Sequence, residues 1–365
     1  MDNAQNTRVA ILISTMNRPD FLIRTLNYYA KMRSPHPVYL GDSSNPDNID
    51  IIKKFINNLQ GRLEVHYNWY PPVFDNLEKN LSLIKEKYTV ISGDDDYEIP
   101  SSLIKCAEFL ENNPDYASAG GYGVTFRLKN SGSYGEIARL ADYPRISLEA
   151  ETASQRLIDF MKNYFTITFA VNRTDHMKEI SVGHVPMIGP WNELSGSCYC
   201  ALSGKSKLID CLGFVRQIHD RQYYANSMVD WLTDKNFYNS YISLRTLLAE
   251  KIAEKDKISK DRAEQVVKDS FWECLQLYMA NSQRDQKGKD KPLKNRKMLK
   301  TLRLKIGASF PVLKTAYRRY LRPFISDKKQ LHYDVLDPHS TYYKDFKPVW
   351  DSFSERGLHT PQNIV

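Results

Sequence analysis

Residues 88–97, Tyr-Thr-Val-Ile-Ser-Gly-Asp-Asp-Asp-Tyr, join a short apolar run to three consecutive aspartates. The apolar run Tyr88–Ser92 is typical of a buried strand. Adjacent carboxylates repel one another, so a fold keeps Asp94–Asp96 together only where positive charge neutralises them. Magnesium and manganese prefer oxygen ligands and commonly bind one or two carboxylates together with substrate phosphates. The stretch therefore predicts a divalent cation, Mn²⁺ or Mg²⁺, at a strand end; a solvated acidic turn before a helix is the alternative.

Before this stretch, apolar strands alternate with helical patterns. The predicted strands are Arg8–Thr15, Val38–Gly41 and Leu63–Tyr67, and the predicted helices are Phe21–Lys31, Ile49–Leu59 and Phe74–Lys87. This alternation predicts a Rossmann-like α/β fold with a mostly parallel sheet and helices on both faces. Ligands of such sheets bind beyond the carboxyl ends of the strands. We therefore expect the loops after Thr15, Gly41 and Ser92 to share one edge.

The composition is that of a globular protein. The chain has 365 residues, of which 42% are hydrophobic and 26% charged, which excludes a disordered or collagen-like chain. A formal net charge of +8 indicates an anionic partner such as phosphate, nucleic acid or acidic lipid. We expect three parts: an α/β domain over residues 1–225, a helical, basic extension over 226–330, and a tail over 331–365 whose packing is not predicted.

Residues 298–322 interleave Lys and Arg with apolar side chains. Such a segment can lie on an anionic membrane surface, with its basic groups on the lipid headgroups. A solvated basic helix is the alternative. Nucleic acid is not expected as a partner, because no zinc-finger, helix-turn-helix or RNA-recognition signature accompanies the charge.

The expected location is the cytoplasm, with 298–322 as a peripheral contact to the inner face of the cell membrane. No apolar run reaches the roughly 18 residues of a membrane span, and the polar start of the chain lacks the features of a secretory signal. Five cysteines, an odd number, favour reduced thiols.

The order of four short motifs resembles that of the family 2 glycosyltransferases of the GT-A fold, which carry an Asp-x-Asp-type metal motif. The motifs are Ile13–Arg18, Leu40–Ser44, Lys79-Asn80 and Ser92–Asp96, and the resemblance covers residues 7–225. It implies a metal-dependent glycosyltransferase that moves a sugar from a nucleoside-diphosphate donor, most commonly a UDP-sugar, to a hydroxyl of a glycan or lipid-linked acceptor. Such enzymes serve bacterial-type surface polysaccharide or glycoconjugate synthesis.

The resemblance also implies a set of donor-binding residues: Thr15, Asn17, Arg18, Asp42, Lys79, Asp94 and Asp95. Of these, Thr15 and Arg18 would border the nucleotide, Asp42 would hydrogen-bond the base or ribose, and Lys79 would lie near the pyrophosphate.

Two registers of the metal motif remain open. Asp94 and Asp96 fit the Asp-x-Asp spacing. If the motif is instead aligned on Pro100, Gly93 takes the place of the first acid, and Asp95 or Asp96 becomes the metal ligand. In relatives a His often follows the strand after the base, and His219 in that position is predicted as an additional metal or diphosphate contact. An ordinary core or surface histidine is the alternative.

Sugar transfer also needs a group that removes the proton of the acceptor hydroxyl. Inverting relatives take this base from an acid at the start of a helix, and Glu193 precedes the helical pattern Ser195–Ser203. We predict Glu193 as the base of an inverting direct displacement; an ordinary acid in the first helical turn is the alternative. Two other function classes remain, a sugar nucleotidyltransferase and a non-catalytic protein that binds nucleotide sugars or membranes.

Overall fold

The computed structural model describes residues 7–59, 61–71, 76–181, 191–221, 231–289 and 330–354. The chain forms two compact units. The larger unit comprises Met1–Cys274 together with Leu331–Val365, and the smaller unit comprises Leu275–Gln330. The sheet lies in the larger unit, together with every predicted site residue.

Four parallel strands form the amino-terminal half of the sheet, in the order β3-β2-β1-β4. They are β1 (Val9–Thr15), β2 (Val38–Asp42), β3 (Val65–Trp69) and β4 (Tyr88–Gly93). β1, β2 and β4 are almost wholly buried, as expected of Val-, Ile- and Leu-rich strands between two helix layers. The predicted strands are confirmed, each boundary lying within two residues of its expected place.

The other half of the sheet is mixed. Its strands are β5 (Tyr97–Glu98), β6 (Tyr116–Leu128), β7 (Ile137–Tyr143), β8 (Val171–Arg173) and β9 (Lys205–Gln217). The long strands β6 and β9 are parallel, whereas β5, β7 and β8 pair antiparallel with their neighbours. Parallel pairing therefore dominates the amino-terminal half. Antiparallel pairing, which the sequence did not predict, begins with β8.

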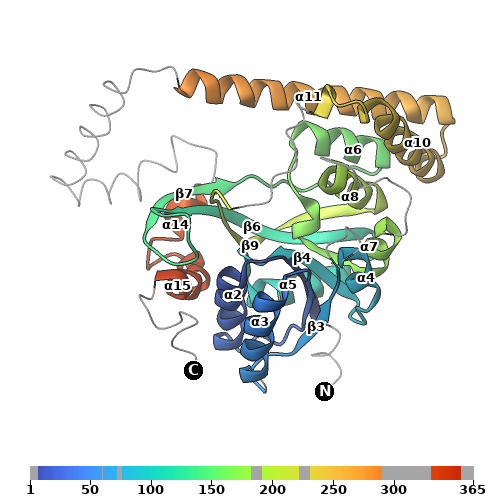
Figure 1. Ribbon diagram of the computed structural model, residues 1–365. Helices are drawn as coiled ribbons and strands as arrows, with labels where there is room; N and C mark the ends of the chain where they lie inside the picture. Colours follow the sequence, from blue (N-terminus) through green and yellow to red (C-terminus); the bar gives the residue numbers. More distant parts are fainter. Residues whose placement is uncertain are drawn as a thin grey trace. The chain divides into compact units, whose positions relative to one another are not determined.

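Helices cover both faces of the sheet, as expected (Figure 1). One face carries α2 (Pro19–Lys31), α3 (Pro46–Asn58) and α5 (Pro100–Asn112). The other carries α4 (Asn76–Ser82), α6 (Ala153–Lys162), α7 (Thr174–Ser181) and α8 (Trp191–Ser203), with the short 3₁₀ turn η1 (Ile167–Phe169) beside them. Local sequence sets several helix starts: each of α2, α3 and α5 begins with a proline, and the Asn45 side chain caps α3.

The carboxyl-terminal segment completes the core of the larger unit. Its helices are α14 (Leu331–Asp334) and α15 (Thr341–Ser354), and α15 packs against α2 and β9. Phe346, Val349 and Phe353 are fully buried, and Phe353 stacks on Phe126 with 4.4 Å between ring centroids. Residues 331–354 therefore belong with residues before 275, so the predicted division at 225 and 330 differs from the two units observed.

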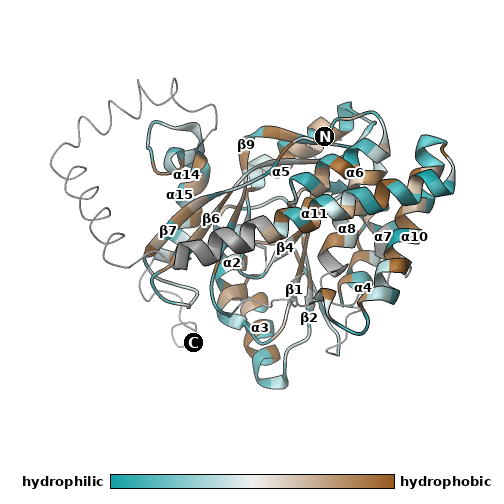
Figure 2. Ribbon diagram, turned by 90° about the horizontal axis from the view of Figure 1, so that it is seen from above, coloured by the Kyte–Doolittle hydropathy of each residue, from teal (hydrophilic) through white to brown (hydrophobic). Residues whose placement is uncertain are grey.

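Helical structure dominates the described part of the extension, as predicted. α10 (Phe237–Asp256) lies in the larger unit, and α11 (Lys260–Lys289) runs from it into the smaller one. In Figure 2 the coloured parts of these helices carry both hydrophilic and hydrophobic residues, whereas the strands are mostly hydrophobic. The basic segment 298–322 lies outside the described residues. Among the helices that the structure describes, none has the length and apolar character needed to cross a membrane.

Candidate functional site

The predicted common edge of the sheet is present. Thr15 at the end of β1 lies opposite Asp42 of β2, and Ser14 lies opposite Gly93 of β4. The Thr15 hydroxyl donates a hydrogen bond to Asp94 Oδ2 at 2.7 Å. Three loops that are distant in sequence therefore meet where an α/β sheet binds its ligands.

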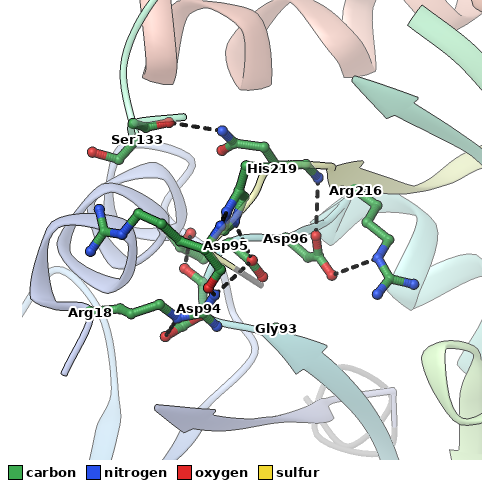
Figure 3. A network of polar contacts seen from close by, with 12 residues as sticks. Arg18, Gly93, Asp94, Asp95, Asp96, Ser133, Arg216 and His219 are labelled. Carbon is green, nitrogen blue, oxygen red and sulfur yellow. Dashed lines mark hydrogen bonds and ion pairs between the residues drawn. The ribbon is translucent and has the colours of Figure 1, made fainter. Parts of the chain in front are cut away.

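Asp94 is fully buried, and chain groups occupy both of its carboxylate oxygens. Oδ2 accepts hydrogen bonds from Thr15 and from Arg18 Nε (3.2 Å), and Oδ1 forms an ion pair with a terminal nitrogen of the same arginine. Burial, with the charge of Asp95, raises the pKa of Asp94 to about 7, although Arg18 opposes that shift. Asp94 thus anchors Arg18 across the edge of the sheet (Figure 3).

Asp95 pairs with a histidine and an arginine. Its Oδ2 lies 2.7 Å from His219 Nε2 and 3.2 Å from a terminal nitrogen of Arg18. The backbone N–H of Arg221 donates to His219 Nδ1 at 3.1 Å, so Nε2 carries the ring proton and donates to Asp95. Burial alone would raise the pKa of Asp95, but the His219 hydrogen bond and the Arg18 charge outweigh burial and lower it. Asp95 is therefore the aspartate best stabilised as a carboxylate.

Asp96 interacts with residues at the end of β9. Its Oδ1 accepts the backbone N–H of Gln217 at 3.1 Å, and its Oδ2 lies 3.9 Å from Arg216 Nε (Figure 3). Burial, followed by the charge of Asp95, raises the pKa of Asp96 well above its usual range. A further positive charge near Oδ2 would favour the ionised form of this carboxyl.

Two carboxylate oxygens converge beside Gly93. A Cβ at this position would lie 2.5 Å from Asp95 Oδ1 and 3.0 Å from Asp96 Oδ2, so only a glycine lets both oxygens lie this close to the main chain. Within the described residues, Asp95 Oδ1 accepts no hydrogen bond. Two acidic oxygens that lie close together beside Gly93 are the kind of ligand pair that a hard divalent cation, also held by substrate phosphates, would take.

The same geometry distinguishes between the two predicted registers. Asp95 and Asp96 have oxygens beside Gly93, whereas Asp94 is bound to Arg18 and His219 is bound to Asp95. Among the residues that the structure describes, no three His, Cys, Asp or Glu side chains are grouped to enclose a metal ion. The arrangement is thus compatible with a two-carboxylate site in the register anchored at Pro100, and the cation and its ligands stay predictions.

Asp42 and Asn17 shape the neighbouring loops. Asp42 is fully buried and accepts hydrogen bonds from the Ser44 N–H (2.8 Å) and the Tyr67 hydroxyl (2.9 Å). Asn17 has a left-handed backbone (φ 57°), and its side-chain oxygen accepts the Asn45 N–H at 2.9 Å. Both residues lie at the predicted edge and hold the loop after β2, and their contact with a nucleotide stays a prediction.

Comparison with known proteins yields likenesses in structure alone. No protein-family model matches the chain, and no curated protein matches it in sequence. The structure of S. aureus TarS residues 1–349 in complex with UDP-GlcNAc matches with a TM-score of 0.51 at 14% identity, covering 79% of this chain and 77% of that chain. The same fragment in complex with UDP matches with a TM-score of 0.48 at 14% identity and the same coverage.

The likeness shows the fold. The chain has the mixed α/β architecture of the TarS fragment, which confirms the GT-A-like fold class. At 14% identity, the roles of individual residues rest on the geometry of this chain.

Two predicted residues are placed only in part. Lys79 is exposed on α4, a helix that packs against β1 and β2 in the nucleotide-binding half. Glu193 lies in the first turn of α8, as predicted, but its side chain lies outside the described residues. Their contacts with pyrophosphate and with an acceptor stay predictions.

Sequence reasoning missed Arg24 and Phe21 among the residues that hold the site; Arg216, Gln217 and Arg221 were expected there as possible phosphate contacts, with solvated surface charge as the alternative. Arg24 donates to the Asp95 carbonyl at 2.8 Å, and the Gln217 backbone holds Asp96. Phe21 stacks on His219 with 4.5 Å between centroids, and the Arg221 guanidinium lies 4.9 Å from the Phe21 ring. The sequence contained one sign of the role of Arg24. It is a second arginine, six residues after Arg18, which is about one and two-thirds helical turns.

Proposed function

We propose that this chain is a glycosyltransferase that takes a sugar from a nucleoside-diphosphate donor, in particular a UDP-sugar. The observation that carries the proposal is the pair of carboxylate oxygens beside Gly93, at the sheet edge where the loops bearing Thr15 and Asp42 meet. A UDP-sugar is supported by the TarS fragment of the same fold, which was solved in complex with UDP-GlcNAc.

In this proposal Asp95 and Asp96 hold Mn²⁺ or Mg²⁺ together with the donor diphosphate. The bound cation would supply positive charge to the departing diphosphate. Arg18, whose side chain is 20% exposed, lies at the surface of the same cluster and can donate to phosphate oxygens. His219 fixes the orientation of Asp95, and Asp94 fixes that of Arg18.

The acceptor is proposed to be a hydroxyl of a glycan or of a lipid-linked precursor. Glu193, at the start of α8, would remove the hydroxyl proton while the acceptor oxygen attacks the anomeric carbon and the diphosphate leaves with inversion. Segment 298–322 would bring the enzyme to the anionic inner surface of the cell membrane. Flotation with anionic and neutral vesicles, using the full chain and a variant with neutralised Lys and Arg in this segment, tests that last step.

The test of the proposed function is a turnover screen. The full chain is incubated with individual nucleotide sugars, Mn²⁺ and candidate acceptors, and the release of UDP and of pyrophosphate is measured. Mn²⁺-dependent UDP release with one donor, lost in Asp96→Asn, supports the proposal. Pyrophosphate release instead identifies a nucleotidyltransferase, and donor binding without any turnover identifies a binding protein.

A further inference from the structure

Arg24 is a buried cation whose direct partners are all uncharged. Its side chain extends from α2 and is 1% exposed. It donates to the carbonyls of Asp95 (2.8 Å) and Ser133 (2.5 Å) and to the side-chain oxygen of Gln217. Within the described residues it forms no ion pair at contact distance, and a buried charge without one is costly unless nearby charges or dipoles compensate it.

Two features compensate the charge of Arg24. The guanidinium lies 5.3 Å from the ring centroid of Phe21 and 5.0 Å from that of Tyr97, within the range of cation–π attraction. Its charge also acts on the Asp95 carboxylate and lowers the pKa of that group. Arg24 is thus a fixed positive charge beneath the acidic loop, supplied by the chain itself.

The contacts of Arg24 reach both carboxylates that lie beside Gly93. One arm holds the main chain at Asp95. The other arm holds the side chain of Gln217, whose backbone N–H donates to Asp96 Oδ1 at 3.1 Å. Gln217 Nε2 also donates to the Gly132 carbonyl at 2.9 Å, which ties the same network to the turn between β6 and β7.

We propose that Arg24 is the positioning residue of the cation site: its guanidinium sets the separation of the Asp95 and Asp96 carboxylates by holding the Asp95 carbonyl and Gln217 together. The inference rests on the proposed function, because it assigns a role toward the cation of that site. Lysine cannot replace arginine here, since a single ammonium lacks the planar fork that reaches two partners at once.

The test compares Arg24→Lys with Arg173→Lys. Arg173 is a matched control, because it also donates three hydrogen bonds to carbonyls (Tyr116, Leu110 and Asn113, at 2.7–3.1 Å), and none of them is part of the acidic loop. Mn²⁺ affinity is measured by calorimetry with the metal alone and with UDP, together with the Tm of each variant. We expect Arg24→Lys to weaken Mn²⁺ binding about 10- to 100-fold, and Arg173→Lys to leave it unchanged at a comparable loss of Tm.

Unchanged Mn²⁺ affinity in Arg24→Lys, or an equal loss in both variants at equal Tm, would overturn the proposal. If the unaltered protein binds neither Mn²⁺ nor UDP, the proposed function fails. In that case, crystal structures of the two variants still test the positioning role of Arg24. Asp95 and Asp96 carboxylates that are displaced in Arg24→Lys but not in Arg173→Lys support this role. Carboxylates that have not moved in Arg24→Lys contradict it.

Discussion

His219 donates its Nε2 proton to Asp95 across 2.7 Å, and both side chains are nearly inaccessible, at 1% and 6% exposure. The histidine ring also stacks on Phe21 of α2, with 4.5 Å between ring centroids. His219 therefore acts on the candidate site through Asp95, and Asp95 keeps its other oxygen for a ligand. This relationship makes the histidine a positioning group whose removal has a defined consequence.

Replacing His219 tests that consequence. In His219→Leu, Asp95 Oδ2 loses a buried donor, which we expect to cost about 1–3 kcal/mol of unfolding free energy. The Asp95 carboxylate then turns toward Arg18, and Mn²⁺ affinity falls. His219→Gln keeps an N–H donor and should recover part of both losses. Urea unfolding and Mn²⁺ titration of the two variants measure them, and equal Mn²⁺ affinity in all three proteins would refute the positioning role.

A methyl group at residue 93 should displace the Asp95 and Asp96 carboxylates from their positions beside the main chain. In Gly93→Ala the new Cβ would lie 2.5 Å from Asp95 Oδ1, closer than such contacts allow. We expect loss of Mn²⁺-dependent UDP binding, measured by calorimetry. Gly132→Ala is the control: its Cβ would come no closer than an ordinary 3.4 Å to Asn130, and its carbonyl, which accepts a hydrogen bond from Gln217, belongs to the main chain and is retained. Normal binding in Gly93→Ala would exclude these two carboxylates as the cation site.

The three aspartates should separate into two functional kinds. We expect Asp95→Asn and Asp96→Asn to abolish Mn²⁺-dependent turnover. Asp94→Asn should act mainly on folding, because it weakens the anchor of Arg18, at a cost of about 1–3 kcal/mol. Turnover at several Mn²⁺ concentrations, beside urea unfolding, distinguishes these effects. An Asp94→Asn protein of full stability that needs far more Mn²⁺ would favour the register with Asp94 and Asp96.

Stability should fall in mild acid because of His36. This histidine is buried, accepts the Val9 N–H at 3.0 Å through Nδ1, and lies 3.1 Å from the Pro100 carbonyl through Nε2. Burial lowers the pKa of His36 from 6.5 to about 4. The unfolded chain therefore takes up this proton at a higher pH than the folded protein does, and the unfolding free energy falls as pH drops from 6.5 toward 4.

Between pH 7 and pH 5 the expected loss from His36 alone is about 2 kcal/mol. Urea unfolding at the two pH values measures the total change. In His36→Gln the protein should be less stable at pH 7, but the loss on acidification should be smaller by that amount. The same loss in both proteins would show that His36 does not titrate in this range.

The carboxyl-terminal helix should be necessary for folding. Phe353 of α15 is fully buried against Phe126, so Phe353→Ala is expected to cost about 3–5 kcal/mol. Lys344→Ala, at an exposed position of the same helix, should change stability by less than about 0.5 kcal/mol. Thermal and urea unfolding of both variants provide the comparison, and equal stability would mean that α15 is not part of the core.

The amino-terminal half could be predicted from sequence because its signals are local. Runs such as Val9–Ile13 are apolar throughout, and the polar loops between them mark the ends of strands and helices. Parallel pairing then follows from the alternation of strands and helices, and it brings Thr15, Asp42 and Asp94 to one edge.

The neutralisation of the aspartates could not be predicted in the same way. Arg24 meets Gln217 across 193 residues and Ser133 across 109, and no local pattern encodes contacts of that range. From sequence, a cation was the simplest partner for three carboxylates. In the structure Arg18, Arg24 and Arg216 carry part of that charge, which leaves two oxygens, on Asp95 and Asp96, to face a ligand.

The most direct measurement is anomalous X-ray diffraction at the manganese edge from crystals grown with UDP and Mn²⁺. We predict one strong manganese peak beside Gly93, in contact with Asp95 Oδ1, Asp96 Oδ2 and the diphosphate. UDP bound at this edge without a manganese peak, or a peak held by other side chains while the Asp95 and Asp96 oxygens remain unligated, would contradict the account.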